Sequence, residues 1–318
     1  MEKTLLVLGA GASKDFCRIF PTGLELIKEI NYHFLTEKKI PEVPESDGIY
    51  LSALMNHISR TFGNDIELFR DIKNKLWAIQ LGYEWRDLRN IVENAISIDN
   101  FIATQINEKK LNHKAADVIK YSIYYLIKGT EQALAEGKYD LSENWINVLA
   151  HKVCENNIDS IINNLSVITF NYDRTFEKYF CKYLAKYIKL NSDQINQLQN
   201  KVLHVYDSLG DLNEIPFELE NNKVDILKNK YSRIKLIDDR SKINISLSNV
   251  DDYKKVHFIG FGYDRTNLEL LNLEQFTRAT FSGTAYNFKD SQINELKSKY
   301  NINTINVSCN KYIENIEL

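Results

Sequence analysis

Short, largely apolar runs occur near the N-terminus and throughout the second half of the chain, and each run stops at a glycine or a polar residue. The first run covers residues 4–8 and ends at Gly9. Runs of this length without polar alternation are typical of strands that are buried on both faces. Further strands are therefore predicted in the second half of the chain, at residues 166–170, 201–206, 255–259, 279–282 and 304–307.

Helical spacing separates these predicted strands. Alternating strands and helices imply a parallel sheet covered on both faces, and the strand at residue 4 must join it because an isolated strand is not stable. We therefore predict an α/β fold with a Rossmann-like parallel sheet. Apolar residues at three- and four-residue intervals predict helices over residues 22–36, 174–189, 222–230, 267–274 and 290–299.

A long stretch between the first strand and the others has a different pattern. From about residue 51 to residue 165 the spacing is helical throughout, with no strand signal. This pattern predicts an all-helical insertion after the first βα unit. Residues 1–50 and 166–318 would then form one split α/β domain, and residues 51–165 an inserted helical subdomain.

Composition narrows the class of protein. The chain has 318 residues and a net charge of −3, so no basic excess suggests direct nucleic-acid binding. The four cysteines form no C-x-x-C pair, so we expect no structural zinc site. Scattered free cysteines fit a reducing compartment, and no run approaches the roughly 20 apolar residues of a membrane span. We expect a cytoplasmic protein.

The first candidate motif follows the first strand and reads Gly9-Ala10-Gly11-Ala12-Ser13. Glycines at such a turn let the backbone approach a phosphate, and the amides that follow can donate hydrogen bonds to it. The third glycine of the dinucleotide fingerprint would fall at Lys14, so the dehydrogenase pattern fails. Taken alone, the motif is explained equally well by a plain tight turn.

Two polar motifs follow the next two predicted strands. In the stretch 169–173, Asn171 and Asp173 are two residues apart and should point to one side, although Asp173 could instead cap the next helix. His204 lies at the end of the following strand, where a parallel sheet faces its ligand crevice. A lone histidine is more often surface or core, and His257, in mid-strand, is better explained by packing.

The fourth motif is Gly260-Phe261-Gly262-Tyr263-Asp264, again directly after a strand. Its glycines could admit an adenosine close to the backbone, while Asp264 could accept hydrogen bonds or cap the next helix. Each of these four signals is weak by itself. Their position at successive strand ends predicts one shared site.

The order of these motifs resembles the sirtuin superfamily. The resemblance covers residues 4–264, and Pro21-Thr22-Gly23 is similar to a motif of the bacterial sirtuin-like proteins of antiphage defence. Those relatives are NAD hydrolases, so the resemblance implies that NAD is the substrate and that no metal is needed. The NAD-binding residues it implies are Gly9, Ala10, Gly11, Ser13, Pro21, Thr22, Thr169, Asp173, Gly260, Gly262 and Asp264.

The catalytic residues that the resemblance implies are Asn171, which would orient the attacking water, and His204. Many relatives carry His-Gly-Ser-Leu-Gly where this chain has Tyr206-Asp207-Ser208-Leu209-Gly210, so Tyr206 competes with His204 for the family's histidine position. A shift of two residues along a strand keeps the same face. The chain also has no cysteine between residues 182 and 308, so the zinc ribbon of deacetylating sirtuins is absent.

The expected function is an NAD+ hydrolase that releases nicotinamide and ADP-ribose, as the toxic effector of an abortive-infection system against phage. A neutral histidine would accept a proton from the water or from a ribose hydroxyl. We expect a homo-oligomer, or a partner subunit such as a ring-forming ATPase or a nuclease. Two alternatives stay open: a sirtuin-type protein deacylase or ADP-ribosyl transferase, and a non-catalytic NAD or ADP-ribose sensor.

Overall fold

A computed structural model describes residues 1–23, 25–26, 113–218, 230–235, 245, 247 and 249–318. The chain divides into two compact units, each built from separate stretches of sequence. The first, here called the sheet unit, consists of residues 1–20, 139–205 and 244–318. The second unit consists of residues 21–138 and 206–243.

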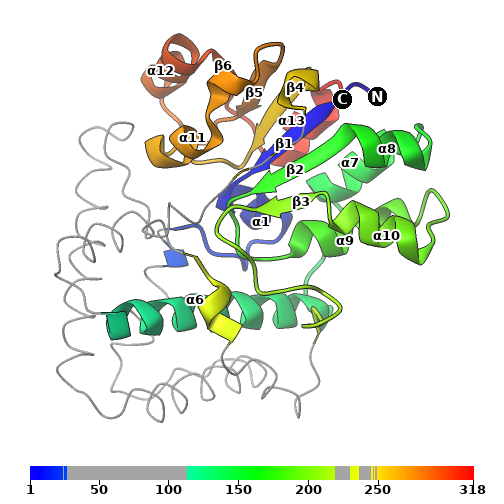
Figure 1. Cartoon of the computed structure of the whole chain (residues 1–318), viewed down its shortest axis with the longest axis vertical. Helices are drawn as coiled ribbons and strands as arrows, with labels where there is room; N and C mark the ends of the chain where they lie inside the picture. The colour runs from blue at the N-terminus through cyan, green and yellow to red at the C-terminus, as the bar shows by residue number, and fades with distance from the viewer. Residues whose placement is uncertain (24, 27–112, 219–229, 236–244, 246, 248) are drawn as a thin grey trace. The chain divides into compact units, whose positions relative to one another are not determined.

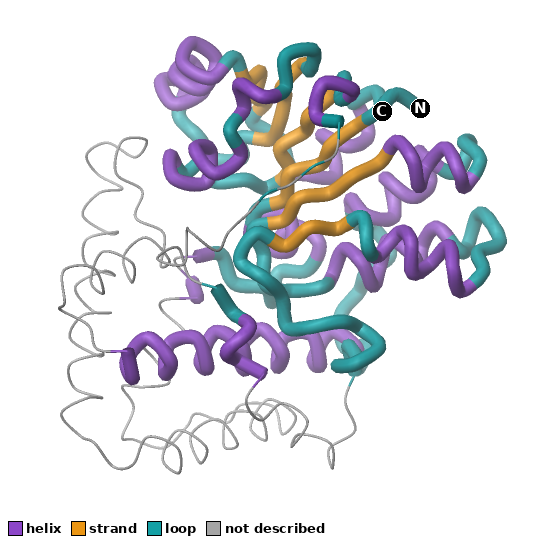
Figure 2. The backbone as a smooth tube through the Cα atoms, in the orientation of Figure 1, coloured by secondary structure: helices purple, strands orange, loops and turns teal. Residues whose placement is uncertain are grey.

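The sheet unit contains six strands, and all of them run parallel, which confirms the predicted α/β class (Figures 1 and 2). Their order across the sheet is β3-β2-β1-β4-β5-β6. The strands are β1 (Thr4–Leu8), β2 (Leu165–Thr169), β3 (Val202–His204), β4 (Lys255–Ile259), β5 (Thr280–Thr284) and β6 (Ile302–Ile305).

The uniformly apolar sequence of β1 explains its central place. Leu5, Leu6 and Val7 have no solvent-exposed surface, because β1 pairs with β2 on one side and with β4 on the other. A strand covered on both faces has no position at which a polar side chain could reach water. The absence of alternation in residues 4–8 therefore reflects a central strand.

The strand order reverses between β1 and β4. The chain proceeds from β1 outward to β2 and β3, then crosses back to β4 and continues outward to β5 and β6. This is the order of the Rossmann fold, in which ligands bind beyond the carboxyl ends of the strands at the reversal. Register aligns the strand ends there: Leu8 lies opposite Thr169 and Ile259, and Thr169 lies opposite His204.

Helices α1, α7, α9 and α13 pack against one another in the sheet unit, with α7 contacting α9 and α13. In the view of Figure 1, α7 and α13 lie behind the strands. The helices of this unit are α1 (Ala10–Phe16), α7 (Trp145–Val153), α8 (Ile158–Asn164), α9 (Thr175–Leu184), α10 (Ser192–Gln199), α11 (Arg265–Leu271), α12 (Asp290–Tyr300) and α13 (Cys309–Asn315).

The predicted domain boundary at residue 165 differs from the division in the structure. Helices α7 and α8 belong to the sheet unit because the apolar face of α7, with Trp145, Leu149 and Val153 buried, covers α9 and α13. Residues 206–243 also leave the sheet unit for the second unit. The predicted helical segments before residue 113 lie outside the described residues, apart from the start at Gly23, as does most of 222–230.

The second unit contains α6 (His113–Ala135). Hydrogen bonds join this helix to residues 209–217, which follow β3 in the sequence. The Tyr124 hydroxyl donates to the Leu209 carbonyl at 3.2 Å. The buried Lys128 ammonium donates to the carbonyls of Pro216 and Phe217 at 2.7 and 2.6 Å, and lies 3.5 Å from the buried Glu131 carboxylate. These polar contacts satisfy a cation that has no access to water.

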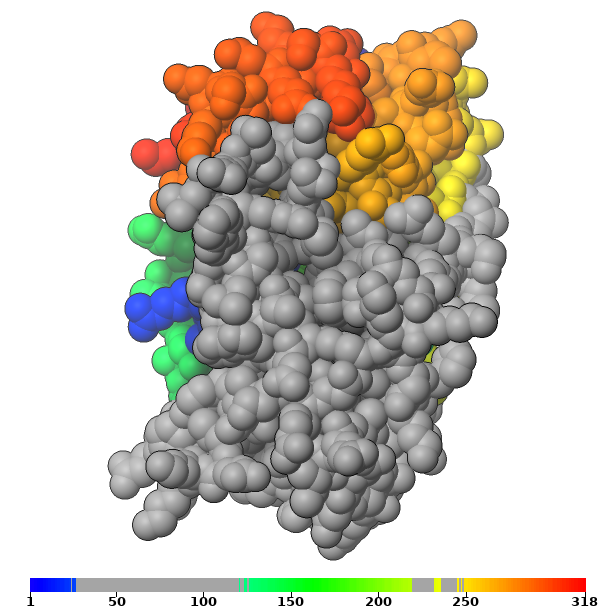
Figure 3. Space-filling view, turned by 90° about the vertical axis from the view of Figure 1, so that its left-hand side faces the viewer, coloured from blue at the N-terminus to red at the C-terminus, as the bar shows by residue number. Residues whose placement is uncertain are grey.

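Strands β3 and β6 form the two edges of the sheet. The last strands and helices of the sheet unit form the orange and red surface in the space-filling view (Figure 3). None of the helices in the described ranges combines the length and apolar character that a membrane span requires.

Candidate active site

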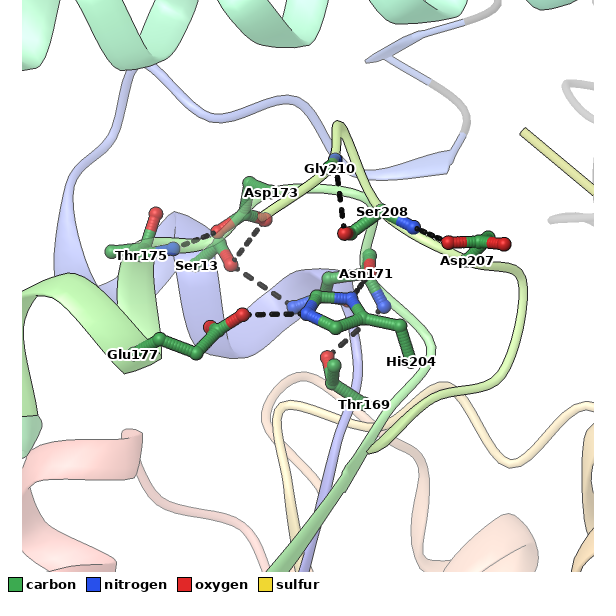
Figure 4. Close-up of polar contacts among 10 residues, drawn as sticks. All are labelled: Ser13, Thr169, Asn171, Asp173, Thr175, Glu177, His204, Asp207, Ser208 and Gly210. Atoms are coloured by element: carbon green, nitrogen blue, oxygen red, sulfur yellow. Dashed lines mark hydrogen bonds and ion pairs between the residues drawn. The ribbon is translucent and has the colours of Figure 1, made fainter. Parts of the chain in front are cut away.

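The ends of β1 and β2 bring two distant motifs into direct contact. Asn171 follows β2 by two residues, and its side-chain Nδ2 donates to the Gly9 carbonyl at 2.9 Å and to Ser13 Oγ at 3.0 Å (Figure 4). The main-chain N–H of Asn171 donates to Thr169 Oγ1 at 3.1 Å. The carboxamide is therefore fixed at the turn between β1 and α1, where the strand order reverses.

Ser13 links Asn171 to Asp173. The serine hydroxyl accepts from Asn171 and donates to Asp173 Oδ2 at 2.8 Å, while Asp173 Oδ1 accepts the main-chain N–H of Thr175 at 3.1 Å. All of these side chains are buried or nearly so. The carboxylate of Asp173 thus serves both purposes considered from the sequence: it faces the same partner as Asn171 and it binds an amide at the start of α9.

His204 occupies the end of β3 and has both ring nitrogens on acceptors. Nδ1 lies 2.8 Å from the Asn171 carbonyl oxygen, and Nε2 lies 2.6 Å from Glu177 Oε1 (Figure 4). A carbonyl oxygen can only accept, and an ionised carboxylate can only accept. With the Glu177 carboxylate ionised, both ring nitrogens donate, and His204 is an imidazolium in an ion pair with Glu177.

Burial alone would lower the pKa of His204, because it penalises the charged ring. The charge and hydrogen bond of Glu177, the Asn171 carbonyl and the charge of Asp173 act in the opposite direction and raise the pKa above its ordinary value. This environment differs from the neutral histidine base expected from the sequence. In this arrangement His204 holds a proton and has no vacant nitrogen with which to accept another.

Glu177 is the residue of this cluster that the sequence analysis missed. It lies in the first turn of α9, six residues after Asn171. An acidic residue in the first turn of a helix is ordinarily explained by the helix dipole, which hides a second role. One signal for Glu177 was present in the sequence, its place in the first turn of a predicted helix. In the structure that place lets its carboxylate reach His204 at the end of β3.

A small cavity, with room for about one water molecule, lies beside this cluster within the sheet unit. Three of the polar atoms on its lining residues have no hydrogen-bond partner in the described part of the chain: Asn171 Oδ1, Thr175 Oγ1 and Glu177 Oε2. Trp145 and Phe176 contribute an apolar wall, with ring centroids 5.9 Å apart. The Trp145 indole N–H donates to the Ala12 carbonyl at 2.8 Å.

The glycine turn after β1 packs directly against the turn after β4. A Cβ on Gly9 or Gly11 would lie 2.6 or 2.7 Å from the Gly260 carbonyl oxygen, and one on Gly260 would overlap the Ala12 amide. Gly260 also has a φ of +55°, in the left-handed region that favours glycine. Contact between two backbones therefore explains these three glycines without a ligand.

Several amides of this turn are used inside the protein. Gly9 N–H donates to the Ile259 carbonyl at 3.1 Å, and Gly11 N–H donates to the Gly260 carbonyl at 2.9 Å. Ala12 N–H donates to the Gly9 carbonyl at 2.9 Å. Of the first three amides of α1, the Ala10 N–H alone has no partner among the described residues.

The motif after β4 divides into packed and open positions. Gly260 N–H donates to Thr284 Oγ1 at 2.8 Å, and Asp264 Oδ1 caps α11 by accepting from the amides of Thr266 and Asn267 at 3.0 and 3.3 Å. A Cβ on Gly262 would meet no atom of the described residues within 4 Å. Asp264 therefore acts as the cap considered from the sequence, while packing does not explain Gly262.

Three residues proposed from the resemblance belong to the second unit: Pro21, Thr22 and Tyr206. The Thr22 amide and hydroxyl both donate to Glu25 Oε2, at 2.8 and 2.9 Å. Tyr206 is buried, and the Asp207 that follows it has a φ of +64°. Their placement at a nucleotide site stays a prediction.

His257 is a packing residue, as its mid-strand position predicted. Its Nδ1 lies 3.0 Å from both Ser282 Oγ and the Tyr312 hydroxyl, and burial lowers its pKa to about 4. Within the described ranges, no three His, Cys, Asp or Glu side chains gather as a metal site would require. Comparisons with protein-family models, with curated proteins and with solved structures found no match to this chain.

Proposed function

We propose that this chain is an NAD+ glycohydrolase, which cleaves the bond between nicotinamide and ribose to give nicotinamide and ADP-ribose. One observation carries the proposal: the Asn171 carboxamide is bonded to Gly9 and Ser13, at the point where the strand order of a parallel sheet reverses. Dinucleotides bind at this point in folds with the same strand order. An amide side chain there would lie beside the ligand.

To catalyse this reaction, the protein has to position the substrate and the water and to stabilise the positive charge of the transition state. Nicotinamide leaves NAD+ as a neutral ring, and the ribose carbon passes through an oxocarbenium-like transition state. A water oxygen bonds to that carbon, the carbon–nitrogen bond breaks with its electron pair moving to nicotinamide, and one proton is released. The NH2 group of Asn171 donates to Gly9 and Ser13, and these two hydrogen bonds fix the orientation of the carboxamide. Its oxygen could then stabilise positive charge on the ribose or hold the water.

The positions that packing leaves open suggest where the rest of the dinucleotide would bind. The Ala10 amide at the start of α1 could donate to a phosphate oxygen. Gly262 offers space for an adenosine close to the backbone. These two positions are proposed as contacts with the pyrophosphate and adenosine, whereas Gly9 and Gly11 would act by letting the two turns meet.

The string after β3 favours Tyr206 as the counterpart of the family's histidine. Asp207 adopts a left-handed backbone conformation, with φ of +64°, where the family string has glycine. Aligning Asp207 with that glycine puts Tyr206 at the histidine position and His204 two residues before it. His204 then supports the site through Asn171 and Glu177.

The proposal is tested by incubating the purified full chain with NAD+ and measuring free nicotinamide. Removing the amide in Asn171→Ala is expected to lower kcat by about 100-fold or more while NAD+ still binds. Asn303→Ala, which changes an exposed asparagine on β6, is the matched control and should retain wild-type turnover. Equal turnover by Asn171→Ala and the wild type would contradict the assignment.

A non-catalytic NAD or ADP-ribose sensor is the second candidate. It is favoured by His204, whose two nitrogens are both on acceptors, so that the described residues of the sheet unit offer no neutral imidazole in this cluster. Calorimetry with NAD+ and with ADP-ribose separates the two functions. Binding of either ligand without nicotinamide release would favour the sensor.

The nicotinamide-release assay also tests the alternative that the chain is a sirtuin-type deacylase or ADP-ribosyl transferase. Addition of an acylated peptide should leave the rate of nicotinamide release unchanged if water is the acceptor. A rate that depends on the peptide would indicate a deacylase or a transferase. The proposed role as a toxic antiphage effector predicts that induced expression depletes cellular NAD, and that Asn171→Ala abolishes this depletion.

A further inference from the structure

Glu177 is bonded to the backbone of Asn171 through a single intermediate, His204. The histidine ring spans the 2.6 Å contact with Glu177 Oε1 and the 2.8 Å contact with the Asn171 carbonyl. The side chains of His204 and Glu177 are only 10% and 9% exposed, so water screens their interaction weakly. Any change in the charge of this pair therefore acts on the peptide that carries the Asn171 carboxamide.

We infer that Glu177 is a positioning residue of the proposed NAD+ site: it keeps His204 as an imidazolium, and that imidazolium fixes Asn171. The inference rests on the proposed function for its consequences on turnover. Its structural part, a cationic His204 held by Glu177, stands on the two short contacts of the ring together with the raised pKa of His204. This role is opposite to that of a neutral histidine base.

Among the described residues, the charged and accepting groups named beside His204 favour the cation. Glu177 comes from the first turn of α9, and the charge of Asp173 comes from the loop between β2 and α9. The Asn171 carbonyl supplies the third acceptor or charge near the ring. Together they raise the pKa of His204 against the effect of burial, so the ring stays protonated at pH values where an ordinary histidine is neutral.

The small cavity has room for a second connection from Glu177 to Asn171, through one water molecule. The other carboxylate oxygen of Glu177, Oε2, has no partner in the described part of the chain, and neither do Asn171 Oδ1 and Thr175 Oγ1. Buried polar atoms of this kind are normally satisfied by an internal water, which needs two to four polar partners. A water that donates to Glu177 and Asn171 and accepts from Thr175 would satisfy all three.

The two roles of His204 give opposite pH profiles. A neutral base works only above its pKa, so turnover would rise as pH increases through the titration of His204. A positioning imidazolium is lost above its pKa, so turnover would fall over the same range. The direction of this limb separates the two mechanisms.

The test uses the full chain and two readouts. The first is an NMR titration of the histidine rings between about pH 5 and 9, with His204→Gln identifying the signal of His204 among the six histidines. We expect His204 to titrate above its ordinary pKa in the wild type and at a lower pH in Glu177→Gln, which keeps the shape but removes the charge. Glu269→Gln, at an exposed ion pair with Arg265, is the matched control and should leave the titration unchanged.

The second readout is nicotinamide release across the same pH range. Glu177→Gln is expected to lower kcat by about 10- to 100-fold with little change in KM, and to move the alkaline limb to lower pH. A wild-type rate that rises with pH through the His204 titration would overturn the inference. A His204 that is neutral near pH 7, or whose titration ignores Glu177→Gln, would also overturn it.

The two readouts keep this inference separate from the proposed function. If the wild type releases no nicotinamide at any pH, the glycohydrolase proposal fails, and the NMR titration still decides whether Glu177 holds a cationic His204. If Glu177→Gln does not fold, the wild-type titration alone gives the protonation state of His204: a raised pKa supports the inference, and a neutral ring near pH 7 overturns it.

Discussion

The two sides of the strand reversal are built differently. On the β4 side, Gly9, Gly11 and Gly260 meet backbone to backbone, and their amides bond within the protein. On the β2 and β3 side, Asn171, Glu177 and His204 form a nearly buried charged network in which two side-chain oxygens have no partner among the described residues.

This difference shows which residues carry information about function. A glycine that admits another backbone is fully explained by packing, even when it follows a strand in a pattern typical of phosphate binding. A buried ion pair and unsatisfied buried oxygens lower the stability of the fold, and such groups are found mostly at functional sites. Asn171 and its neighbours therefore indicate function more strongly than the glycine motifs do.

The largest expected effect is on the packed side. Gly260→Ala would place a Cβ against the Ala12 amide at a residue with φ of +55°, so the two turns could not keep their contact. We expect a loss of more than about 4 kcal/mol in the free energy of unfolding, or failure to fold. Urea denaturation measures this loss, and a variant of near wild-type stability would show that the two turns do not pack as described.

The buried histidine of each side should respond to pH in the opposite direction. His257, on β4, has a pKa lowered by burial to about 4, so below about pH 6.5 the unfolded chain binds a proton that the folded chain excludes. Stability from this residue is lost as pH falls from 6.5 toward 4, by at most about 3 kcal/mol. His204, with a raised pKa, contributes stability that is present at low pH and lost as pH rises.

Unfolding free energies of His257→Gln and Glu177→Gln across pH distinguish these contributions. His257→Gln should flatten the acid side of the wild-type stability profile, and Glu177→Gln should flatten its alkaline side. If both variants altered the same side of the profile of unfolding free energy against pH, the proposed difference between the two histidines would be wrong.

Ser13→Ala tests the polar side directly. The substitution removes the hydroxyl that accepts from Asn171 and donates to Asp173, which leaves a buried carboxylate oxygen short of a donor. We expect a loss of about 1–3 kcal/mol in the free energy of unfolding, measured by urea denaturation, together with lower turnover. Unchanged stability and turnover would mean that this network is not maintained in solution.

A smaller effect is expected from Thr175→Val, which removes one of the three unpartnered polar atoms while keeping the shape of the side chain. If a water links these atoms, the variant should be less stable by about 1 kcal/mol, because the water loses a partner. Thermal denaturation measures the difference. A variant that is more stable than the wild type would indicate a dry cavity and remove the second connection from Glu177 to Asn171.

The smallest effect on stability is expected for Gly262→Ala, since a Cβ there meets nothing within 4 Å in the part of the chain that the structure describes. The change should lie within about 0.5 kcal/mol of the wild type. Calorimetry should nevertheless show weaker binding of NAD+ if an adenosine approaches this backbone. Unchanged affinity would place the adenosine elsewhere.

The sequence pattern predicts the sheet, whereas packing between helices is not visible in it. Each of the six strands in the described sheet lies within a few residues of a predicted one, and β1 gave the clearest pattern because it is buried on both faces. The helices α1, α10 and α13, each of seven or eight residues, were not predicted. The compact units divide near residue 139 instead of 165, and helical spacing alone does not show that α7 packs on α9 and α13.

At the candidate site, the sequence predicted which strand ends meet but not how their side chains pair. Asn171, Asp173 and Ser13 were identified by position, and they contact one another. Glu177 was missed because its first-turn position in α9 has an ordinary explanation. The charge of His204 depends on that missed partner, so its protonation state was not predictable without the fold.

The central claim is that the Asn171 carboxamide lies beside the labile ribose carbon of a bound NAD+. A crystal structure of Asn171→Ala, soaked with NAD+ to limit turnover, tests this most directly. We predict intact NAD+ across the strand reversal, with its nicotinamide ribose next to residue 171 and the Gly9–Ser13 turn. NAD+ bound away from residue 171, or no binding at saturating concentration, would contradict this claim.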